Sequence, residues 1–404
     1  MINKTFTLLT KINHKLSSMA STRPIHKLLN KKRHIITADD ERKKSGRDDI
    51  EFIQILDSYE ITMNVPNDFM QLNREELKPS VNSVVFQPSG LYKLFNAKLY
   101  TDSFFMYWLL MRRERSFKIY LLPHSVLSKK VFTSSYLSKP QKVDWVVFSL
   151  VIGGGGNNYF HWLFDALPRL HLLKESGQWD LVDKFVCNYK FPFHKETLKL
   201  LGIREDQIID IHEYNYLQPK LLMTSTHPRK EYYISPWMVE FLQKSFVSLI
   251  EKDPGNSPHY IYTSRGDAKR RVIINEKEVI ELLKGYDFEI VSMTAFSFIE
   301  QVRLFHFAKV IVAPHGANLA NIAFCQKNTR LLEVFTEEYV AHYYYELALR
   351  MGMEYSYLIC KAAKGSIKTA QDVSLKESQQ ADILIDMEAF KEKVAELGVT
   401  KVVM

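Results

Sequence analysis

The sequence predicts an α/β protein built on a parallel sheet with helices on both faces. From residue 258 onward, apolar strand-like runs alternate with helix-like runs, which is typical of such a sheet. The expected strands are 259–264, 287–291, 309–313 and 330–335, and the expected helices are 276–284, 296–306, 318–323 and 339–351. Because 404 residues exceed the size of a usual single core, we expect two domains.

The clearest boundary is the segment 251–258, which holds two prolines and one glycine. Before it, short strand-like runs are followed by helix-like stretches. The expected parts are a basic arm and charged connector (1–50), an amino-terminal domain (51–252), a carboxy-terminal domain (258–360) and a helical segment (361–404) that packs back on the amino-terminal domain.

The positive charge of the chain is confined to its first residues. The formal net charge is +8, and residues 1–38 hold eight Lys and Arg side chains and no acid, so the rest is neutral overall. A nucleic-acid-binding fold would carry a basic patch itself, so no nucleic-acid partner is expected. Apolar residues recur every three to four positions in the arm. It is therefore either an amphipathic helix on an anionic membrane or a solvated terminus, and liposome binding by a chain lacking residues 2–38 distinguishes the two.

A glycine run and a histidine–aspartate pair follow the strand that ends near residue 152. The glycines at 153–156 precede no Gly-Lys-Ser/Thr, so this is no P-loop. His161 and Asp165 share a helix face, as do Asp165 and Arg169. A carboxylate beside an imidazole can form a general base, or the three residues can fasten the segment to the core. Pro168 is expected to kink or restart the helix near Asp165.

Basic residues follow the expected strand 259–264. Arg265 stands directly at the strand end, and Arg271 lies in the basic cluster beyond it. Arginines at strand ends suit two-pronged contacts with phosphate, whereas a solvated basic face is the alternative.

A turn and a helix start follow the expected strand 309–313. His315, Gly316, Ala317 and Asn318 occupy this junction. Gly316 and Ala317 leave the backbone open, and Asn318 is expected to cap a helix whose free N–H groups face a ligand. His315 either donates to a phosphate or sugar hydroxyl, or belongs to an ordinary tight turn.

Glu333 lies inside the apolar strand 330–335, where an acid needs a partner. A ribose diol or a buried salt bridge would supply one. Ligands of parallel sheets bind at the carboxyl ends of the strands, where Arg265, His315 and Glu333 all fall. The pattern therefore indicates a site for a nucleotide diphosphate.

Together these segments resemble glycosyltransferase family 61 over residues 85–350. The residues that carry the resemblance are Asn158-Tyr159-Phe160-His161-Trp162 with Asp165 and Pro168-Arg169-Leu170, Tyr262-Thr263-Ser264-Arg265 with Ala268, Arg270-Arg271 and Asn275-Glu276, Gln301 before Phe305, Pro314-His315-Gly316-Ala317 with Leu319-Ala320-Asn321 and Phe324, and Glu333.

The resemblance implies a GT-B architecture, in which two Rossmann-like domains face each other across a cleft. It also implies an inverting, metal-independent transfer from a UDP-sugar to a glycan or lipid-linked glycan, as in surface or capsular polysaccharide synthesis, with no cofactor. The expected base is Asp165 or His161. Arg265, Arg271 and the helix start at 316–318 would stabilise the departing UDP with His315 beside them, and Glu333 would hold the ribose.

The cysteine count and the absence of an expected spanning segment suggest a cytoplasmic protein, peripheral at most on the inner face of the membrane. Only Cys187, Cys325 and Cys360 occur, and their spacing suits neither a disulfide framework nor zinc. The rival functions are a metal-dependent hydrolase or phosphatase using His161, Asp165 and His315, and a non-catalytic module that binds nucleotide or carbohydrate.

Overall fold

The computed structural model has a mixed α/β architecture with sheets rich in parallel strands. It describes residues 33–37, 50–62, 83–101, 106–113, 116–121, 140–151, 158–211, 213, 216–230, 233–250, 255, 257–266, 268, 270–363 and 378–401. Most of the basic arm, the charged connector and the glycine run at 153–156 lie outside these residues. Among the described residues, no helix is long and apolar enough to cross a bilayer.

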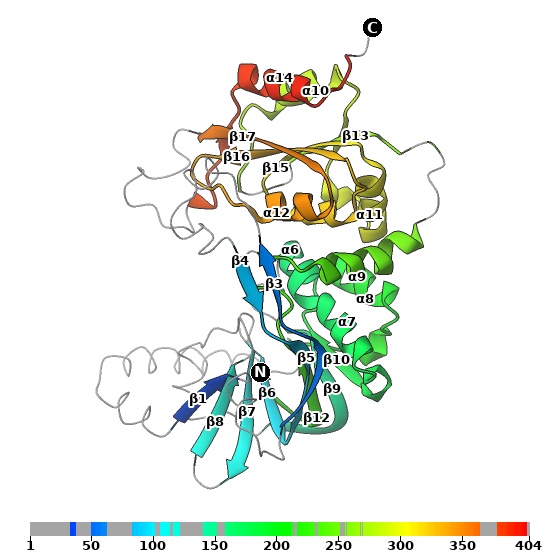
Figure 1. Cartoon of the computed structure of the whole chain (residues 1–404), viewed down its shortest axis with the longest axis vertical. Coiled ribbons are helices and arrows are strands. Elements are labelled where there is room, and N and C mark those ends of the chain that lie inside the picture. The colour runs from blue at the N-terminus through cyan, green and yellow to red at the C-terminus, as the bar shows by residue number, and fades with distance from the viewer. Residues whose placement is uncertain are drawn as a thin grey trace, which may run out of the picture.

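The amino-terminal half contains a ten-stranded sheet that is only partly parallel. Its strands are β1 (Arg33–Thr37), β2 (Ile50–Leu56), β5 (Ser89–Phe95), β6 (Ala97–Thr101), β7 (Met106–Arg113), β8 (Ser116–Leu121), β9 (Gln141–Ser149), β10 (Lys184–Cys187), β11 (Ile208–Asp210) and β12 (Tyr216–Ser225). Strands β12, β9, β10 and β11 run parallel in that order. On the other side of β12, β5 and β6 pair with it antiparallel. A separate hairpin of β3 (Tyr59–Thr62) and β4 (Ser83–Phe86) extends toward the other half (Figure 1).

Helices follow the parallel strands of this half. They are α6 (Tyr159–His161), the π-helical turn η2 (Trp162–Ala166), α7 (Pro168–Glu175), η3 (Trp179–Leu181), α8 (Pro192–Leu200), η4 (Glu205–Gln207), α9 (Pro236–Phe246) and η5 (Val247–Leu249). The expected interruption near Asp165 is confirmed, because α7 restarts with Pro168 in its first turn, where its missing N–H costs no helical hydrogen bond.

The carboxy-terminal half is a six-stranded sheet in the order β14-β13-β15-β16-β17-β18, and all but its last pair run parallel. Its strands are β13 (Tyr260–Thr263), β14 (Glu289–Val291), β15 (Val310–Pro314), β16 (Arg330–Thr336), β17 (Glu354–Ala362) and β18 (Ile383–Leu384). Its helices are α10 (Glu276–Lys284), η6 (Met293–Ala295), α11 (Phe298–Phe307), η7 (Ala317–Phe324) and α12 (Tyr343–Arg350). The alternation expected from the sequence is confirmed, and β17 and β18 extend it.

Local chemistry explains several of these boundaries. Ser297 and Glu300 form a capping box that starts α11, with the backbone N–H of Ser297 donating to Glu300 Oε2 at 2.8 Å. Every residue of β15 is buried, as expected of a central parallel strand covered on both faces.

The carboxy-terminal segment does not pack where we expected. Helix α14 (Met387–Glu396) contacts α10 and β17, and its Phe390 and Val394 are buried in the core of the six-stranded sheet. Figure 1 shows α14 at the end of the molecule farthest from the ten-stranded sheet. The apolar face of α14 therefore packs on the six-stranded sheet. An amphipathic pattern predicts that a helix packs on one face, but it does not specify the sheet.

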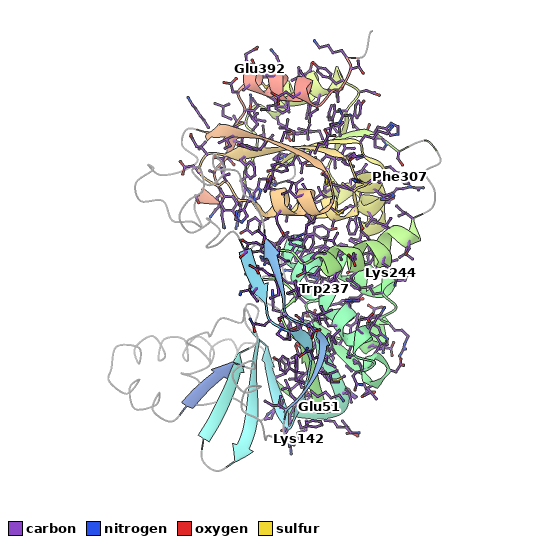
Figure 2. All side chains as sticks on the ribbon, viewed as in Figure 1. Glu51, Lys142, Trp237, Lys244, Phe307 and Glu392 are labelled. Carbon is purple, nitrogen blue, oxygen red and sulfur yellow. The ribbon has the colours of Figure 1, made fainter. Side chains whose placement is uncertain are left out.

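Helix α9 lies between the two sheets (Figure 1), and Figure 2 labels Trp237 and Lys244 along it. One buried cluster crosses this junction. In it the ring of Phe246 on α9 stacks edge-on against Phe298, with 4.7 Å between centroids, and Phe324 joins them. Because these residues come from both halves, the junction is held by apolar burial.

Candidate active site

Three of the predicted site residues meet at the carboxyl edge of the six-stranded sheet. Strands β13, β15 and β16 are parallel neighbours, so the segments that follow β13 and β15 emerge side by side. Arg265 follows β13 and His315 follows β15, whereas Glu333 lies within β16, opposite Ala313. The strand order thus brings together residues that are up to 68 positions apart.

His315 and Glu333 form a buried pair. The Nδ1 atom of His315 lies 2.5 Å from Glu333 Oε1, and the hydroxyl of Tyr355 donates to Glu333 Oε2 at 2.8 Å. Glu333 is 0% exposed and His315 is 5% exposed. With both oxygens engaged inside the protein, Glu333 is not placed to hold a ribose diol in this structure. The alternative prediction was a buried salt bridge, and the structure gives Glu333 a buried partner of this kind in His315, which forms an ion pair only when the imidazole is protonated.

The charges around this pair explain its electrostatics. Burial raises the pKa of Glu333 well above its usual value, against the opposing effects of Tyr355 and Arg271. Burial lowers the pKa of His315 well below its usual value, and Arg271 and Arg265 lower it further. Both arginines are therefore close enough to act on the imidazole.

Arg265 lies across the turn that begins with Gly316. Its backbone N–H donates to Glu276 Oε1 at 2.8 Å, and its Nη2 donates to the carbonyl of Arg270 at 2.6 Å. A Cβ atom on Gly316 would lie only 2.5 Å from Arg265 Nη1, so the guanidinium occupies the space that any side chain here would need. Gly316 is extended, with φ of 179°, so space and not backbone strain requires glycine.

Arg271 has a left-handed backbone, with φ of 53°, which non-glycine residues seldom adopt. Its guanidinium lies 5.6 Å from the ring centre of Tyr339, and its buried Nε has no hydrogen-bond partner among the described residues. Burial lowers the pKa of Arg271. A half-buried arginine on a left-handed backbone, with its buried Nε donor left over, is the kind of group that an anionic ligand would satisfy.

The helix start is not built as the sequence suggested. Segment η7 is a 3₁₀ helix that begins at Ala317, with Gly316 in the capping position and no side-chain cap. Asn318 lies inside η7 and does not cap it. In the tighter 3₁₀ winding the carbonyl of Gly316 accepts a hydrogen bond from the residue three positions on, where an α-helix would use the fourth. The N–H of Leu319 donates to it at 3.0 Å.

The second constellation centres on Asp165 in the π-helical turn η2. His161 Nδ1 lies 2.6 Å from Asp165 Oδ2, as the spacing predicted. Arg229 donates to both oxygens of Asp165, from Nε at 2.7 Å and from Nη2 at 3.0 Å. His227 Nε2 lies 3.8 Å from the same carboxylate. Four nitrogen atoms from three residues therefore surround the two oxygens of Asp165.

Burial alone would raise the pKa of Asp165, but Arg229, His227 and His161 together hold it well below its usual value. The carboxylate is thus a fixed, fully partnered anion. In contrast, the side chain of His161 is 33% exposed. Of the two predicted candidates, His161 is the one that a substrate can reach.

Arg169, which the sequence placed beside Asp165, points elsewhere. It donates to Ser225 Oγ at 3.1 Å, to the carbonyl of Val151 at 3.3 Å and to Thr224 Oγ1. Burial lowers its pKa to about 9 against the opposing effect of Asp165. It fastens α7 to β12, while Arg229 takes the position beside the carboxylate.

Sequence reasoning missed Arg229 and His227. They follow β12, a strand within a stretch that we expected to be mainly helical. A His-Pro-Arg run that begins two residues after the end of a strand is a signal of the same kind as the one that identified Arg265, and recognising β12 would have made it visible.

The two constellations share an aromatic wall. The ring of Tyr343 at the start of α12 lies 5.7 Å from that of Phe160 and 6.3 Å from that of His315, while Tyr344 lies 5.8 Å and 5.4 Å from the same two rings. Phe160 precedes His161. The imidazoles of His161 and His315 thus belong to adjoining parts of one region.

A hydrogen-bonded bridge also joins the two halves here. The hydroxyl of Tyr159 donates to Asn321 Oδ1 at 2.6 Å, and Asn321 Nδ2 donates to Gln301 Oε1 at 3.1 Å. Gln301 in turn donates to the carbonyls of Met293 and Phe296. The bridge positions α6 against η7, and so the histidine–aspartate pair against the Gly316 turn.

A cavity of about 770 Å³ lies elsewhere, at the opposite ends of the strands. It is lined by residues of α9, by His306 near the end of α11, and by Lys327 and Arg350, which precede β16 and β17. None of the predicted site residues lines it. Within the described residues, no three His, Cys, Asp or Glu side chains gather in an arrangement that could hold a metal ion.

Comparison with known proteins finds similarity in the part of the chain that holds most of these residues. Residues 159–332 match the family model described as Glycosyltransferase 61. The chain is also similar to a protein O-linked-mannose beta-1,4-N-acetylglucosaminyltransferase 2 of Xenopus tropicalis, with 29% identity over 196 residues. That alignment covers 43% of this chain and 32% of the relative, so the chain spans about a third of the relative's length.

Proposed function

We propose, from the match of residues 159–332 to the glycosyltransferase 61 model, that the chain transfers a sugar from a nucleotide sugar, UDP-linked, to a hydroxyl of a glycan or lipid-linked glycan. The observation that carries the donor assignment is the gathering of Arg265, Arg271 and His315 around the Gly316 turn. We propose the two sheets as the two halves of a GT-B arrangement, and surface or capsular polysaccharide as the product class.

The positive groups of this cluster suit a departing diphosphate. Arg265 and Arg271 supply charge, and the buried Nε of Arg271 supplies an unused donor. The start of η7 adds backbone N–H groups at Ala317 and Asn318. When the bond between the anomeric carbon and the diphosphate oxygen breaks, these groups would stabilise the negative charge that develops on that oxygen.

The base of the proposed reaction is His161. Because Asp165 is ionised and accepts from Nδ1 of His161, the proton of the neutral imidazole lies on Nδ1 and the lone pair lies on Nε2. Nε2 can therefore take the proton of the acceptor hydroxyl as that hydroxyl attacks the anomeric carbon. Asp165 orients the ring and stabilises the imidazolium. A single displacement of this kind inverts the anomeric centre.

Donor binding provides the first test of this proposal. A panel of UDP-sugars and other nucleotide sugars should raise the melting temperature, because ligand at 100 times its Kd stabilises the folded protein by about 2.7 kcal/mol. The shift should be the same with and without EDTA, since side chains bear the charge of the diphosphate. No shift with any member of the panel would contradict the nucleotide-sugar assignment.

Gly316→Ala should weaken nucleotide binding with little effect on folding. The new Cβ would lie 2.5 Å from Arg265 Nη1 and force the flexible guanidinium aside. Loss of one charged hydrogen bond, worth about 1.5–3 kcal/mol, predicts an affinity for UDP lower by about 10-fold or more. Titration calorimetry measures it. Gly266→Ala is the matched control, since its Cβ would meet nothing closer than 3.4 Å and should leave affinity unchanged.

A further inference from the structure

The proposed transfer leaves one feature without a role, namely the buried carboxyl group of Glu333. It is 0% exposed, with His315 on one oxygen and Tyr355 on the other. An acid at the centre of a sheet is costly to bury, and its partner is an imidazole beside the proposed diphosphate site. Its effect on a ligand must therefore pass through His315.

The hydrogen bonds limit where protons can lie. Tyr355 donates its hydroxyl proton to Oε2, so one proton lies between Glu333 Oε1 and His315 Nδ1, which are 2.5 Å apart. The raised pKa of Glu333 and the lowered pKa of His315, both caused mainly by burial, favour this proton on the carboxyl group. Nδ1 is then the acceptor, and the ring carries its own proton on Nε2.

Other ionisable groups act on the pair from each element around it. They are Arg265 and Arg271 after β13, Tyr339 before α12, Tyr344 in α12 and Tyr355 in β17. The two cations oppose a further positive charge on His315, and burial opposes a negative charge on Glu333. A neutral pair with an N–H at Nε2 satisfies both conditions, and that N–H is the only ring hydrogen available to a ligand.

We propose that Glu333 and His315 together hold a transferable proton for the departing diphosphate. This inference rests on the proposed transfer from a nucleotide sugar. As the bond between the anomeric carbon and the β-phosphate oxygen breaks, its electron pair goes to that oxygen, which takes the proton from His315 Nε2. His315 Nδ1 takes the proton of Glu333, which becomes a carboxylate. The pair is restored when solvent returns a proton to His315 Nε2 and Nδ1 gives its proton back to Glu333. His161 releases to solvent the proton it took from the acceptor.

Glu333→Gln separates this role from a structural one. The amide can donate to His315 Nδ1 and preserve the N–H at Nε2, but it has no proton to give up. UDP affinity should change less than about 3-fold, whereas the rate of UDP release from the donor should fall by about 100-fold or more. The matched control is Glu346→Gln. Glu346 is also buried, at 1% exposed, and it contacts Arg350 and the backbone N–H of Ile234. The rate of UDP release by this variant should equal that of the wild type.

Two outcomes overturn the inference, and each is distinct from failure of the proposed function. If the wild type turns over a nucleotide sugar and Glu333→Gln does so within 3-fold, the proton is not used. The second measurement needs no activity, because ¹⁵N NMR of the wild type at neutral pH reports which ring nitrogen of His315 is protonated. Protonation at Nε2 supports the pair, and an unprotonated Nε2 overturns it. If the wild type neither binds nor turns over any nucleotide sugar, the proposed function itself fails, while the NMR result still decides the state of the pair.

Discussion

His161→Gln is expected to lower the rate of sugar transfer by about 10²–10⁴-fold while leaving UDP binding unchanged. The imidazole is 33% exposed, its Nδ1 is held by Asp165, and its Nε2 is the basic atom. Glutamine can keep a hydrogen bond to Asp165 but cannot accept a proton. Steady-state kinetics with the donor identified by the binding panel would measure the change, which should appear in kcat rather than in KM for the donor.

A matched control lies on the next helix. His171 also faces an acid four residues on, with Nδ1 3.8 Å from Glu175 Oε1, but it stacks on Trp237 away from the proposed site. His171→Gln should transfer sugar at the wild-type rate. If both histidine variants lost activity equally, or if His161→Gln kept it, His161 would not be the base.

Arg229→Met is expected to lower the free energy of unfolding by about 3–5 kcal/mol at neutral pH, because it leaves the buried Asp165 carboxylate without its main partner. Arg229 holds both oxygens of that carboxylate, and methionine fills similar space without charge. Denaturant unfolding measures the loss. Arg204→Met, in an exposed pair with Asp206, is the control and should leave the unfolding midpoint unchanged.

The same variant should change the dependence of stability on pH. In the wild type the pKa of Asp165 is depressed on folding, so its stabilisation is present above the unfolded pKa of about 3.9 and is lost as pH falls through the folded pKa. Without Arg229, burial of the carboxylate should raise that pKa. The stability difference between the two proteins should therefore be smaller at pH 4 than at pH 7. A difference independent of pH would show that Arg229 acts only through packing.

Much of the carboxy-terminal half could be predicted from the sequence. The helix 276–284 matches α10 in its bounds, and the strands around 260, 310 and 332 are β13, β15 and β16. These elements follow from apolar periodicity within a few residues, which a single chain displays directly. The placement of Arg265 and His315 at one edge also followed, since parallel strands end on the same side.

The amino-terminal sheet was harder to predict. It combines parallel strands β9–β12 with antiparallel partners β5 and β6, so its order depends on pairings between distant segments. No periodicity within a segment specifies which neighbour it will pair with. The stretch that contains β12 was therefore predicted to be mainly helical. Because the strand was not predicted, the position of Arg229 after a strand end was not recognised.

The sequence by itself determined the alternation of strands and helices, the histidine–aspartate pair four residues apart and the positive residues at the strand ends. Only the tertiary structure decided that Arg229 and not Arg169 partners Asp165, that Glu333 is enclosed by His315 and Tyr355, and that α14 packs on the six-stranded sheet. The physical reason is that helix and strand formation depends on neighbours along the chain. The partner of a buried charge depends on which distant segments are packed against it, and desolvation makes that choice decisive.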